Sequence, residues 1–366
     1  MMSIILLVVF ALCISATAGS DPILQCLNRF LAETRIPGVS MAIMSNNSRS
    51  PKVYSAGLAD VALNVRLKNE MVLPVGSITK LFTSISIYIL ADEGKLSLDD
   101  RISKWFPDYP HSSEISVTQL INHTSGLKDF VMIQAFDDNM AKAYTEDELL
   151  QMTAAFPLDF PPGTAYRYSN TGFVMLGLIV EKISKMSINQ FIQERIVKPL
   201  GMTDTRTGSD SEVIKNRVTG YRVDPGKLSN AVFASVEAPH ASGNIISSPG
   251  SFVLLSKVFR NGSLLKSSTY QMIKQPPTVA EALAKSQAME LGKTEIKRES
   301  KWGIEWVKIG DGPWLITKDG VFPGYSSMFI YSQQTGICIA LSCNNENAVF
   351  DLLTMGNELI NAPLTK

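Results

Sequence analysis

The chain contains little histidine and cysteine, which limits the metal and disulfide chemistry open to it. Its 366 residues include 3 histidines and 4 cysteines, and no Cys/His spacing matches a zinc site. Cys13 lies in an N-terminal apolar segment, which leaves an odd number of cysteines beyond it. Cys338 and Cys343 would point to opposite faces of one expected strand, so they are interpreted as buried free thiols. We therefore expect neither a metal nor an organic cofactor.

An excess of charge of either sign is also lacking. Lys+Arg and Asp+Glu are balanced at 34 each, and no basic face, charge block or acidic tail occurs. This balance argues against nucleic acid and anionic membrane surfaces as partners. Internal repeats and long low-complexity stretches are missing as well. The length and a hydrophobic content of 45% allow a large core and one to three domains.

The first 18 residues resemble a secretory signal peptide. Residues 4–14 form an unbroken apolar run that is too short to span a bilayer comfortably, and residues 16–18 (ATA) supply a cleavage site. Residues 1–3 contain no Lys or Arg, so an uncleaved N-terminal anchor is the alternative. We expect a secreted or periplasmic protein that begins near Gly19 and has no stable membrane span after cleavage.

Ser77 and Lys80 form the most informative motif, S-x-x-K. On a helix these two residues share one face, so an amine can lie beside a hydroxyl nucleophile. The apolar run at 81–90 predicts a buried helix, and Gly76 allows a sharp turn before it. Ser77 would then lie at a helix N-terminus, where developing negative charge is stabilised. A second S-x-x-K at 263–266 follows Asn-Gly and is expected in a loop or at a helix edge.

Two further motifs follow in chain order. A Y-x-N motif at 168–170 occurs once, and a K-x-G motif at 318–320 ends a strand-like segment. Taken alone, Tyr168 could be a helix-entry residue and Asn170 the N-cap of a helix over 171–183. The K-x-G pattern also fits 301–303 and 308–310, but Lys318 is favoured because it directly precedes GVFPGYSS.

This ordered set resembles the serine β-lactamase and penicillin-binding protein superfamily, most nearly its class C β-lactamases, DD-carboxypeptidases and related esterases. The resemblance extends over about residues 30–345. Further segments carry it: EGKLSLDD at 93–100, NHTSGL at 122–127, PLGM at 199–202 and GVFPGYSS at 320–327.

The resemblance implies an α/β (α+β) fold: an antiparallel sheet built from both termini and flanked by helices, with an inserted, mostly helical lobe (β-lactamase/transpeptidase-like). The pattern agrees, because it predicts strands at 38–44, 52–57, 302–309, 313–318, 325–332 and 337–342, and a last helix at 347–361. We expect one catalytic domain over 19–366, with a sheet lobe at about 24–90 and 290–366 and a helical lobe at about 91–289. The active site would lie in the cleft between these lobes.

The reaction needs a base for Ser77, because a serine hydroxyl is a poor nucleophile and an ordinary lysine, with a pKa of ~10.4, is protonated. Burial, the helix N-terminus and a second cation at Lys318 would lower the pKa of Lys80. Tyr168, placed by the resemblance between the two lysines, would have a lowered pKa and could shuttle protons. We expect a coupled Lys80–Tyr168 pair to take the Ser77 proton.

The resemblance also implies the substrate contacts. Asn170 would bind the substrate's acyl side chain or the Lys80 amine. The oxyanion would lie between the backbone N–H groups of Ser77 and of Val321, which directly follows Gly320 of the K-x-G motif.

One residue departs from the family pattern. Relatives usually carry Thr or Ser at the position of Asp319, where it helps to hold the substrate's carboxylate. An aspartate would repel that carboxylate, unless it turns away and pairs with a lysine. His240 is a further candidate to line the cleft, whereas His123 is expected to be structural because this chemistry needs no histidine.

The leading hypothesis is a secreted serine hydrolase that forms an acyl-Ser77 intermediate. A DD-carboxypeptidase or penicillin-binding activity is the first choice, with a peptidoglycan stem peptide, a β-lactam or an ester as candidate substrate. An esterase or an amidase or aminopeptidase of the same fold is the second choice, and a β-lactamase the third. A catalytically silent binding protein on the same fold is the alternative from another class.

Overall fold

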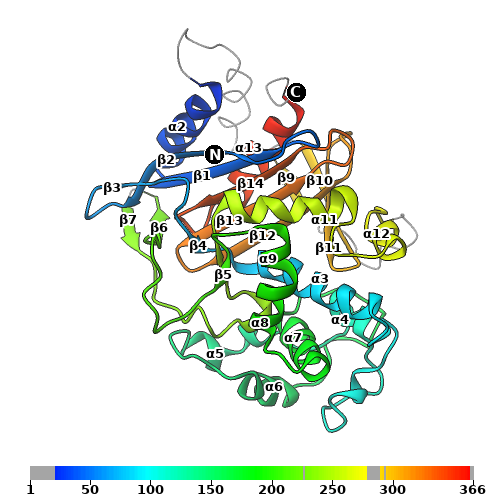
Figure 1. Cartoon of the computed structure of the whole chain (residues 1–366). Coiled ribbons are helices and arrows are strands. Elements are labelled where there is room, and N and C mark those ends of the chain that lie inside the picture. The colour runs from blue at the N-terminus through cyan, green and yellow to red at the C-terminus, as the bar shows by residue number, and fades with distance from the viewer. Residues whose placement is uncertain (1–20, 226, 278–288, 292–293, 363–366) are drawn as a thin grey trace.

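A nine-stranded antiparallel sheet forms the centre of the computed structural model, which describes residues 21–225, 227–277, 289–291 and 294–362 (Figure 1). The expected signal peptide at 1–18 lies outside the described residues. The strands follow in spatial order: β3 (Val65–Arg66), β2 (Lys52–Asp60), β1 (Gly38–Met44), β14 (Cys338–Cys343), β13 (Tyr325–Tyr331), β12 (Leu315–Phe322), β11 (Ile304–Ile309), β10 (Thr294–Lys301) and β9 (Met289–Leu291).

The sheet is built from both ends of the chain, as predicted. Strand β1 pairs with β2 on one side and with β14 on the other, so Val39 lies opposite Cys343. A side-chain contact reinforces this junction, because the backbone N–H of Gly38 donates to Asn344 Oδ1 over 2.7 Å across 306 positions of sequence. Neighbouring strands in the middle of the sheet therefore come from opposite ends of the chain.

Helices cover both faces of the sheet. On one face, α2 (Pro22–Thr34) and α13 (Val349–Asn361) bury apolar side chains such as Phe30 and Leu352. The other face packs against α3 (Thr79–Asp92), α10 (Pro249–Phe252) and α11 (Ser256–Asn261). Cys338 and Cys343 point to opposite faces, and both are buried free thiols, as predicted. The core thus consists of two apolar layers separated by the sheet.

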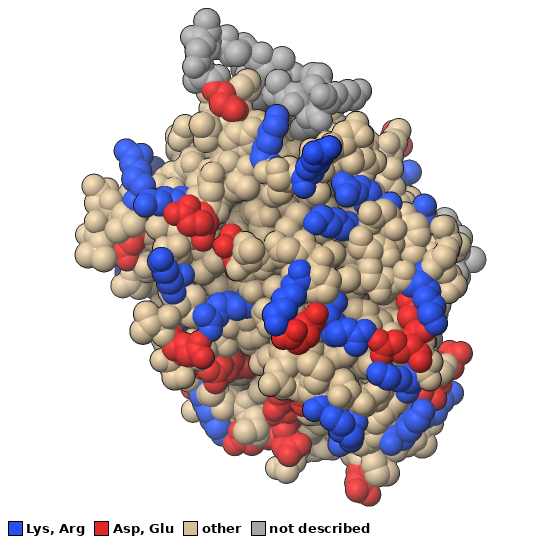
Figure 2. Space-filling model, viewed as in Figure 1, with Lys and Arg blue, Asp and Glu red and all other residues tan. Residues whose placement is uncertain are grey.

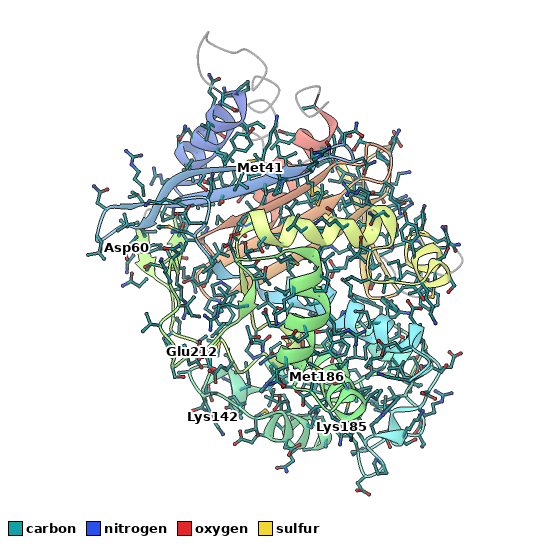
Figure 3. All side chains as sticks on the ribbon, in the orientation of Figure 1. Met41, Asp60, Lys142, Lys185, Met186 and Glu212 are labelled. Atoms are coloured by element: carbon teal, nitrogen blue, oxygen red, sulfur yellow. The ribbon has the colours of Figure 1, made fainter. Side chains whose placement is uncertain are left out.

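The chain between α3 and α10 forms the mostly helical part, and α7 packs directly on α3. In Figure 3, Met41 lies in the sheet, whereas Lys185 and Met186 lie at the opposite end of the molecule. The remaining helices are α4 (Val117–Ile121), α5 (Gln134–Asp137), α6 (Glu146–Ala154), α7 (Asn170–Ser184), α8 (Ile188–Ile192), α9 (Lys198–Leu200) and α12 (Ser267–Ile273). No helix in the described part of the chain is long and apolar enough to cross a membrane.

Short turns and small sheets complete the architecture. The 3₁₀ segments are η2 (Gly76–Ile78), η3 (Ile102–Lys104), η4 (Phe130–Met132), η6 (His240–Ser242) and η7 (Val253–Leu255), and η5 (Gln193–Val197) is a π-helical segment. A three-stranded sheet joins β4 (Leu73–Pro74), β8 (Ile245–Ser247) and β5 (Arg206–Thr207), while β6 (Tyr221–Asp224) pairs with β7 (Lys227–Asn230). On the surface shown in Figure 2, positive and negative side chains are interspersed.

Strand β12 is longer than the pattern predicted. It continues to Phe322, so the K-x-G motif at 318–320 lies inside the strand and not at its end. Its pairing with β11 stops at Thr317, whereas its pairing with β13 continues to Phe322. The last residues of β12 therefore have one edge without a neighbouring strand, and this edge packs against η2.

Candidate active site

A close backbone contact between η2 and β12 positions Ser77. Gly76 has a positive φ of 54°, and a Cβ added there would lie 2.7 Å from the Val321 nitrogen. A Cβ at Gly320 would lie 1.9 Å from the Val75 carbonyl oxygen. Both positions thus require glycine, because a side chain at either one would force the turn and the strand apart. The contact holds the backbone of Ser77 next to that of Val321.

Lys80 and Tyr168 both lie within hydrogen-bonding distance of Ser77 Oγ. Ser77 is in the 3₁₀ turn η2, and Lys80 is in the first turn of α3. Lys80 Nζ lies 3.2 Å from Ser77 Oγ, and the Tyr168 hydroxyl donates to the same oxygen over 2.8 Å. The spacing of the S-x-x-K motif therefore places the amine beside the hydroxyl, as its helical geometry predicts.

Lys80 is fully enclosed, with only 1% of its surface exposed. Its Nζ donates to Asn170 Oδ1 over 2.6 Å and to the Ser242 carbonyl oxygen over 2.8 Å. Burial lowers the pKa of Lys80 well below its usual value, and the nearby cation of Lys318 lowers it further. Both causes favour a neutral amine at this position.

Asp129 fixes the orientation of Asn170. The Asn170 side-chain amide donates to Asp129 Oδ2 over 3.0 Å, and its backbone N–H donates to Oδ1 over 3.1 Å. With its nitrogen directed at Asp129, the amide presents its oxygen to Lys80. The N-cap of α7 is Ser169, so Asn170 is the first helical residue and not the cap.

His123 supports Tyr168 from behind. The two rings stack with their centroids 4.4 Å apart, and the Ser169 backbone N–H donates to His123 Nδ1 over 3.1 Å. Burial lowers the pKa of His123 well below its usual value, and the positive charge of Lys318 lowers it further. His123 is therefore a neutral packing partner that holds the tyrosine ring in place.

The expected low pKa of Tyr168 is wrong. Burial raises the pKa of Tyr168 well above its usual value, and the carboxylate of Glu305 raises it further. The two lysines around the phenol belong to sequence motifs, whereas the carboxylates beside it become its neighbours only in the folded chain. The Tyr168 hydroxyl is therefore a protonated donor to Ser77.

Lys318 belongs to a compact group of four charges. Its Nζ donates to Glu305 Oε1 over 2.6 Å, and Asp319 Oδ1 lies 3.1 Å from the Arg298 guanidinium. Burial would raise the pKa of Asp319, but Lys318 and Arg298 lower it to about 2. Glu305 and Asp319 in turn raise the pKa of Lys318 despite its burial. Each cation of the group thus faces a carboxylate, and the main partner of Asp319 is an arginine.

His240 does not line the pocket at Ser77, which corrects its expected role. Its Nδ1 lies 2.8 Å from Glu146 Oε1, and its Nε2 lies 2.6 Å from the Tyr144 carbonyl oxygen. Both ring nitrogens are therefore engaged with acceptors on or beside α6. Its neighbours Pro239, Ser242 and Gly243 line the pocket instead.

A pocket of about 340 Å³ opens in front of Ser77. Ser77, Asn170 and Val321 line it, together with Phe130 of η4 and Phe136 of α5. Lys80 and Tyr168 contact Ser77 but are not among the residues that line the pocket. Within the described residues, no group of three or more His, Cys, Asp or Glu side chains could hold a metal ion.

Sequence reasoning did not identify several residues that shape this site. Asp129, Ser242, Arg298 and Glu305 contact the predicted residues but belong to none of the three motifs. Asp129 closely follows the NHTSGL segment, which was a usable signal. Glu305 and Arg298 gave no signal, because their proximity depends on the pairing of β10 with β11.

Together, this fold and this site define the class of serine hydrolases related to β-lactamases and penicillin-binding proteins. The chain belongs to the beta-lactamase family, whose model matches residues 23–356.

Individual relatives agree with this assignment. The chain is 26% identical over 313 residues to penicillin-binding protein 4* of Bacillus subtilis. The alignment covers 81% of this chain and 66% of that protein. It is 29% identical over 201 residues to protein flp of Staphylococcus aureus. This alignment covers 53% of this chain and 39% of that protein. The chain thus spans less than two thirds of the length of either relative.

Solved structures share the fold. The D-amino acid amidase from Ochrobactrum anthropi SV3 superposes with a TM-score of 0.78 at 23% identity, covering 92% of this chain and 96% of the amidase. The penicillin binding protein from Bacillus halodurans has a TM-score of 0.76 at 20% identity, covering 91% and 98% of the two chains. These similarities confirm the predicted fold class.

Proposed function

We propose that this chain is a serine acyl hydrolase that acts through an acyl-Ser77 intermediate. The observation that carries the proposal is the position of Ser77 Oγ, 3.2 Å from Lys80 Nζ and 2.8 Å from the Tyr168 hydroxyl. A hydroxyl between a buried amine and a protonated phenol has both a base and an acid within reach.

Lys80 is the proposed base. A neutral amine has two N–H bonds and one lone pair, and its two donors are used by Asn170 Oδ1 and the Ser242 carbonyl. The lone pair then faces Ser77 Oγ. Lys80 takes the Ser77 proton as Oγ forms its bond to the substrate's acyl carbon.

Tyr168 is the proposed acid. Its raised pKa keeps the hydroxyl protonated, so it can transfer its proton to the leaving group as the acyl bond breaks. The protonated Lys80 returns a proton to Tyr168, and water then hydrolyses the acyl-Ser77 ester. The backbone N–H groups of Ser77 and Val321 would stabilise the oxyanion of each step.

The charges around Lys318 favour an esterase or amidase over a DD-carboxypeptidase. A stem peptide or β-lactam carries a carboxylate that needs an unpaired cation, but Lys318 faces Glu305, and Arg298 faces Asp319. Penicillin binding remains the second candidate because of the similarity to penicillin-binding protein 4*. The apolar run at 4–14 and the ATA sequence at 16–18 support export of the protein.

Labelling of Ser77 tests this proposal. The purified protein is incubated with a fluorophosphonate, a fluorescent penicillin or a p-nitrophenyl ester, and the intact mass and turnover are measured. We expect a fluorophosphonate adduct and ester turnover in the wild type and neither in Ser77→Ala. Ser263→Ala is the matched control, because Ser263 belongs to the other S-x-x-K motif and donates to Asn261. Full activity of Ser77→Ala would refute the mechanism, and a penicillin adduct would favour the second candidate.

A further inference from the structure

The wall of the Ser77 pocket is predominantly apolar. Besides Ser77 and Asn170, large apolar side chains line it: Phe130, Val131, Phe136, Met140, Val321 and Phe322. Its volume of about 340 Å³ is at the lower end of the range for small-molecule sites. An acyl group of medium size can fill such a space, and each methylene group that it buries strengthens binding by about fourfold.

Charge in and around this pocket disfavours anions. Asp137 is the one charged side chain among the described residues that line it. The two nearby cations are compensated, since Lys318 lies 2.6 Å from Glu305 and Arg298 lies 3.1 Å from Asp319. A substrate carboxylate would have to separate one of these pairs, and the displaced carboxylate would lose its partner in a buried setting. Asp137 would repel the incoming anion as well.

Two strongly exposed apolar residues are neighbours in sequence of residues that line the pocket. Met132 directly follows the lining residue Val131 and is 73% exposed. Phe233 directly precedes the lining residue Ala234 and is 67% exposed. Apolar side chains thus flank two segments of the lining in the sequence.

From these observations we infer that the physiological substrate is an ester or amide with an apolar, carboxylate-free acyl group of medium chain length. The inference rests on the proposed function, because it assigns the acyl group that is transferred to Ser77. The chemistry is unchanged: Ser77 Oγ bonds to the acyl carbon, the leaving group departs with a proton, and water releases the aliphatic carboxylic acid.

A series of p-nitrophenyl esters tests the inference. We measure kcat/KM for the acetate, butyrate, hexanoate and octanoate, and for the monoester of octanedioic acid, which replaces the terminal methyl of octanoate by a carboxylate. We expect kcat/KM to rise about tenfold or more from acetate to hexanoate. We expect at least a tenfold loss on introducing the carboxylate.

Two valine variants locate the effect in the pocket. Val131→Ser should lower the ratio of octanoate to acetate turnover, because Val131 lines the pocket. Val213→Ser is the matched control, since Val213 is 98% exposed and does not line this pocket, and it should keep the wild-type ratio.

The outcomes separate this inference from the proposed function. Ser77-dependent hydrolysis with no preference for chain length, or with a preference for the carboxylate ester, would overturn the inference and leave the role of Ser77 intact. Hydrolysis that persists in Ser77→Ala, or no reaction of Ser77 with any ester or fluorophosphonate, would overturn both.

Discussion

At the scale of single residues, the electrostatics of Lys80 determine what Ser77 can do. Burial and Lys318 lower the pKa of Lys80, whereas Asp129, Glu305 and Asp319 raise it. The lowering effects prevail because the amine is fully enclosed, with two acceptors and the Ser77 hydroxyl as its polar neighbours. The protonation state of Lys80 thus depends on the cation of Lys318, which need not touch the substrate.

Lys318→Met should move the acidic limb of the activity profile to higher pH. The proposed base works when it is deprotonated, so kcat/KM falls as the pH drops through the pKa of Lys80. Lys318 lowers that pKa, so its removal must raise it. A pH profile of kcat/KM for a p-nitrophenyl ester measures the shift.

Lys308→Met is the matched control for this experiment. Lys308 begins another K-x-G pattern at 308–310 but lies near the end of β11, outside the group of four charges. Its profile should match that of the wild type. If the acidic limb of the Lys318→Met profile stayed in place or moved to lower pH, the result would contradict the role given to Lys318.

Sequence reasoning at this scale succeeded where spacing alone sets the geometry. Ser77 and Lys80 are neighbours on one helix face, so their contact could be predicted. Tyr168 and His240 were misjudged because their environments come from distant segments. Burial and then Glu305 on β11 raise the pKa of Tyr168, and Glu146 on α6 binds His240. Neither partner is recognisable before the chain is folded.

At the scale of elements, the contact between η2 and β12 holds Ser77, the proposed nucleophile. Gly76 and Gly320 bring two backbones together without intervening side chains. The η2 turn, which contains Ser77, therefore depends on a strand from the other end of the chain. The backbone N–H groups proposed for the oxyanion come from these same two elements.

Gly76→Ala should be more damaging than an alanine at another glycine with positive φ. Gly94 has a φ of 71° and no neighbour within 4 Å, so Gly94→Ala should cost only the backbone strain of about 1–2 kcal/mol. A Cβ at Gly76 would in addition lie 2.4 Å from the Val321 carbonyl oxygen. We expect about 1–3 kcal/mol more loss and much slower fluorophosphonate labelling.

Chemical denaturation and labelling rates measure both effects. Equal destabilisation of Gly76→Ala and Gly94→Ala would show that the turn does not depend on close contact with β12. The comparison is informative because both residues have a left-handed backbone and differ mainly in their surroundings.

Elements with clear apolar patterns were predicted closely. Strands β1, β13 and β14 and helix α13 match their expected ranges within a few residues. Strand β10 was missed because its sequence, TEIKRESK, is largely charged and resembles a solvent-exposed loop. Helix α2 was also missed, although Asp21 as N-cap and Pro22 in the first turn are recognisable start signals.

At the scale of the whole molecule, stability should depend on pH through His240. Burial would lower the pKa of His240, but Glu146 and the Tyr144 carbonyl outweigh it and raise the pKa. A histidine whose pKa is raised in the folded state contributes its full stabilisation when the pH is below its usual pKa of about 6.5. This contribution is lost as the pH rises through the folded-state pKa.

His240→Asn should therefore lower the free energy of unfolding by about 1 kcal/mol more at acidic than at alkaline pH. Urea denaturation at about pH 5.5 and pH 9 measures this difference. His111→Asn is the matched control, because the His111–Glu114 pair is 45% and 57% exposed and should contribute little at either pH. A pH-independent effect at His240 would argue that the ring is held as a neutral group.

The junction of β1 with β14 has a consequence for biosynthesis. A ribosome that adds about 5–20 residues per second makes these two strands roughly 15–60 seconds apart, since Gly38 and Asn344 are separated by 306 positions. Until β14 emerges, one edge of β1 lacks its partner, and until β12 emerges, Ser77 lacks its neighbouring strand. Ser77 can therefore take up its place beside Val321 only after the ribosome has passed β12, more than 230 residues beyond the serine itself.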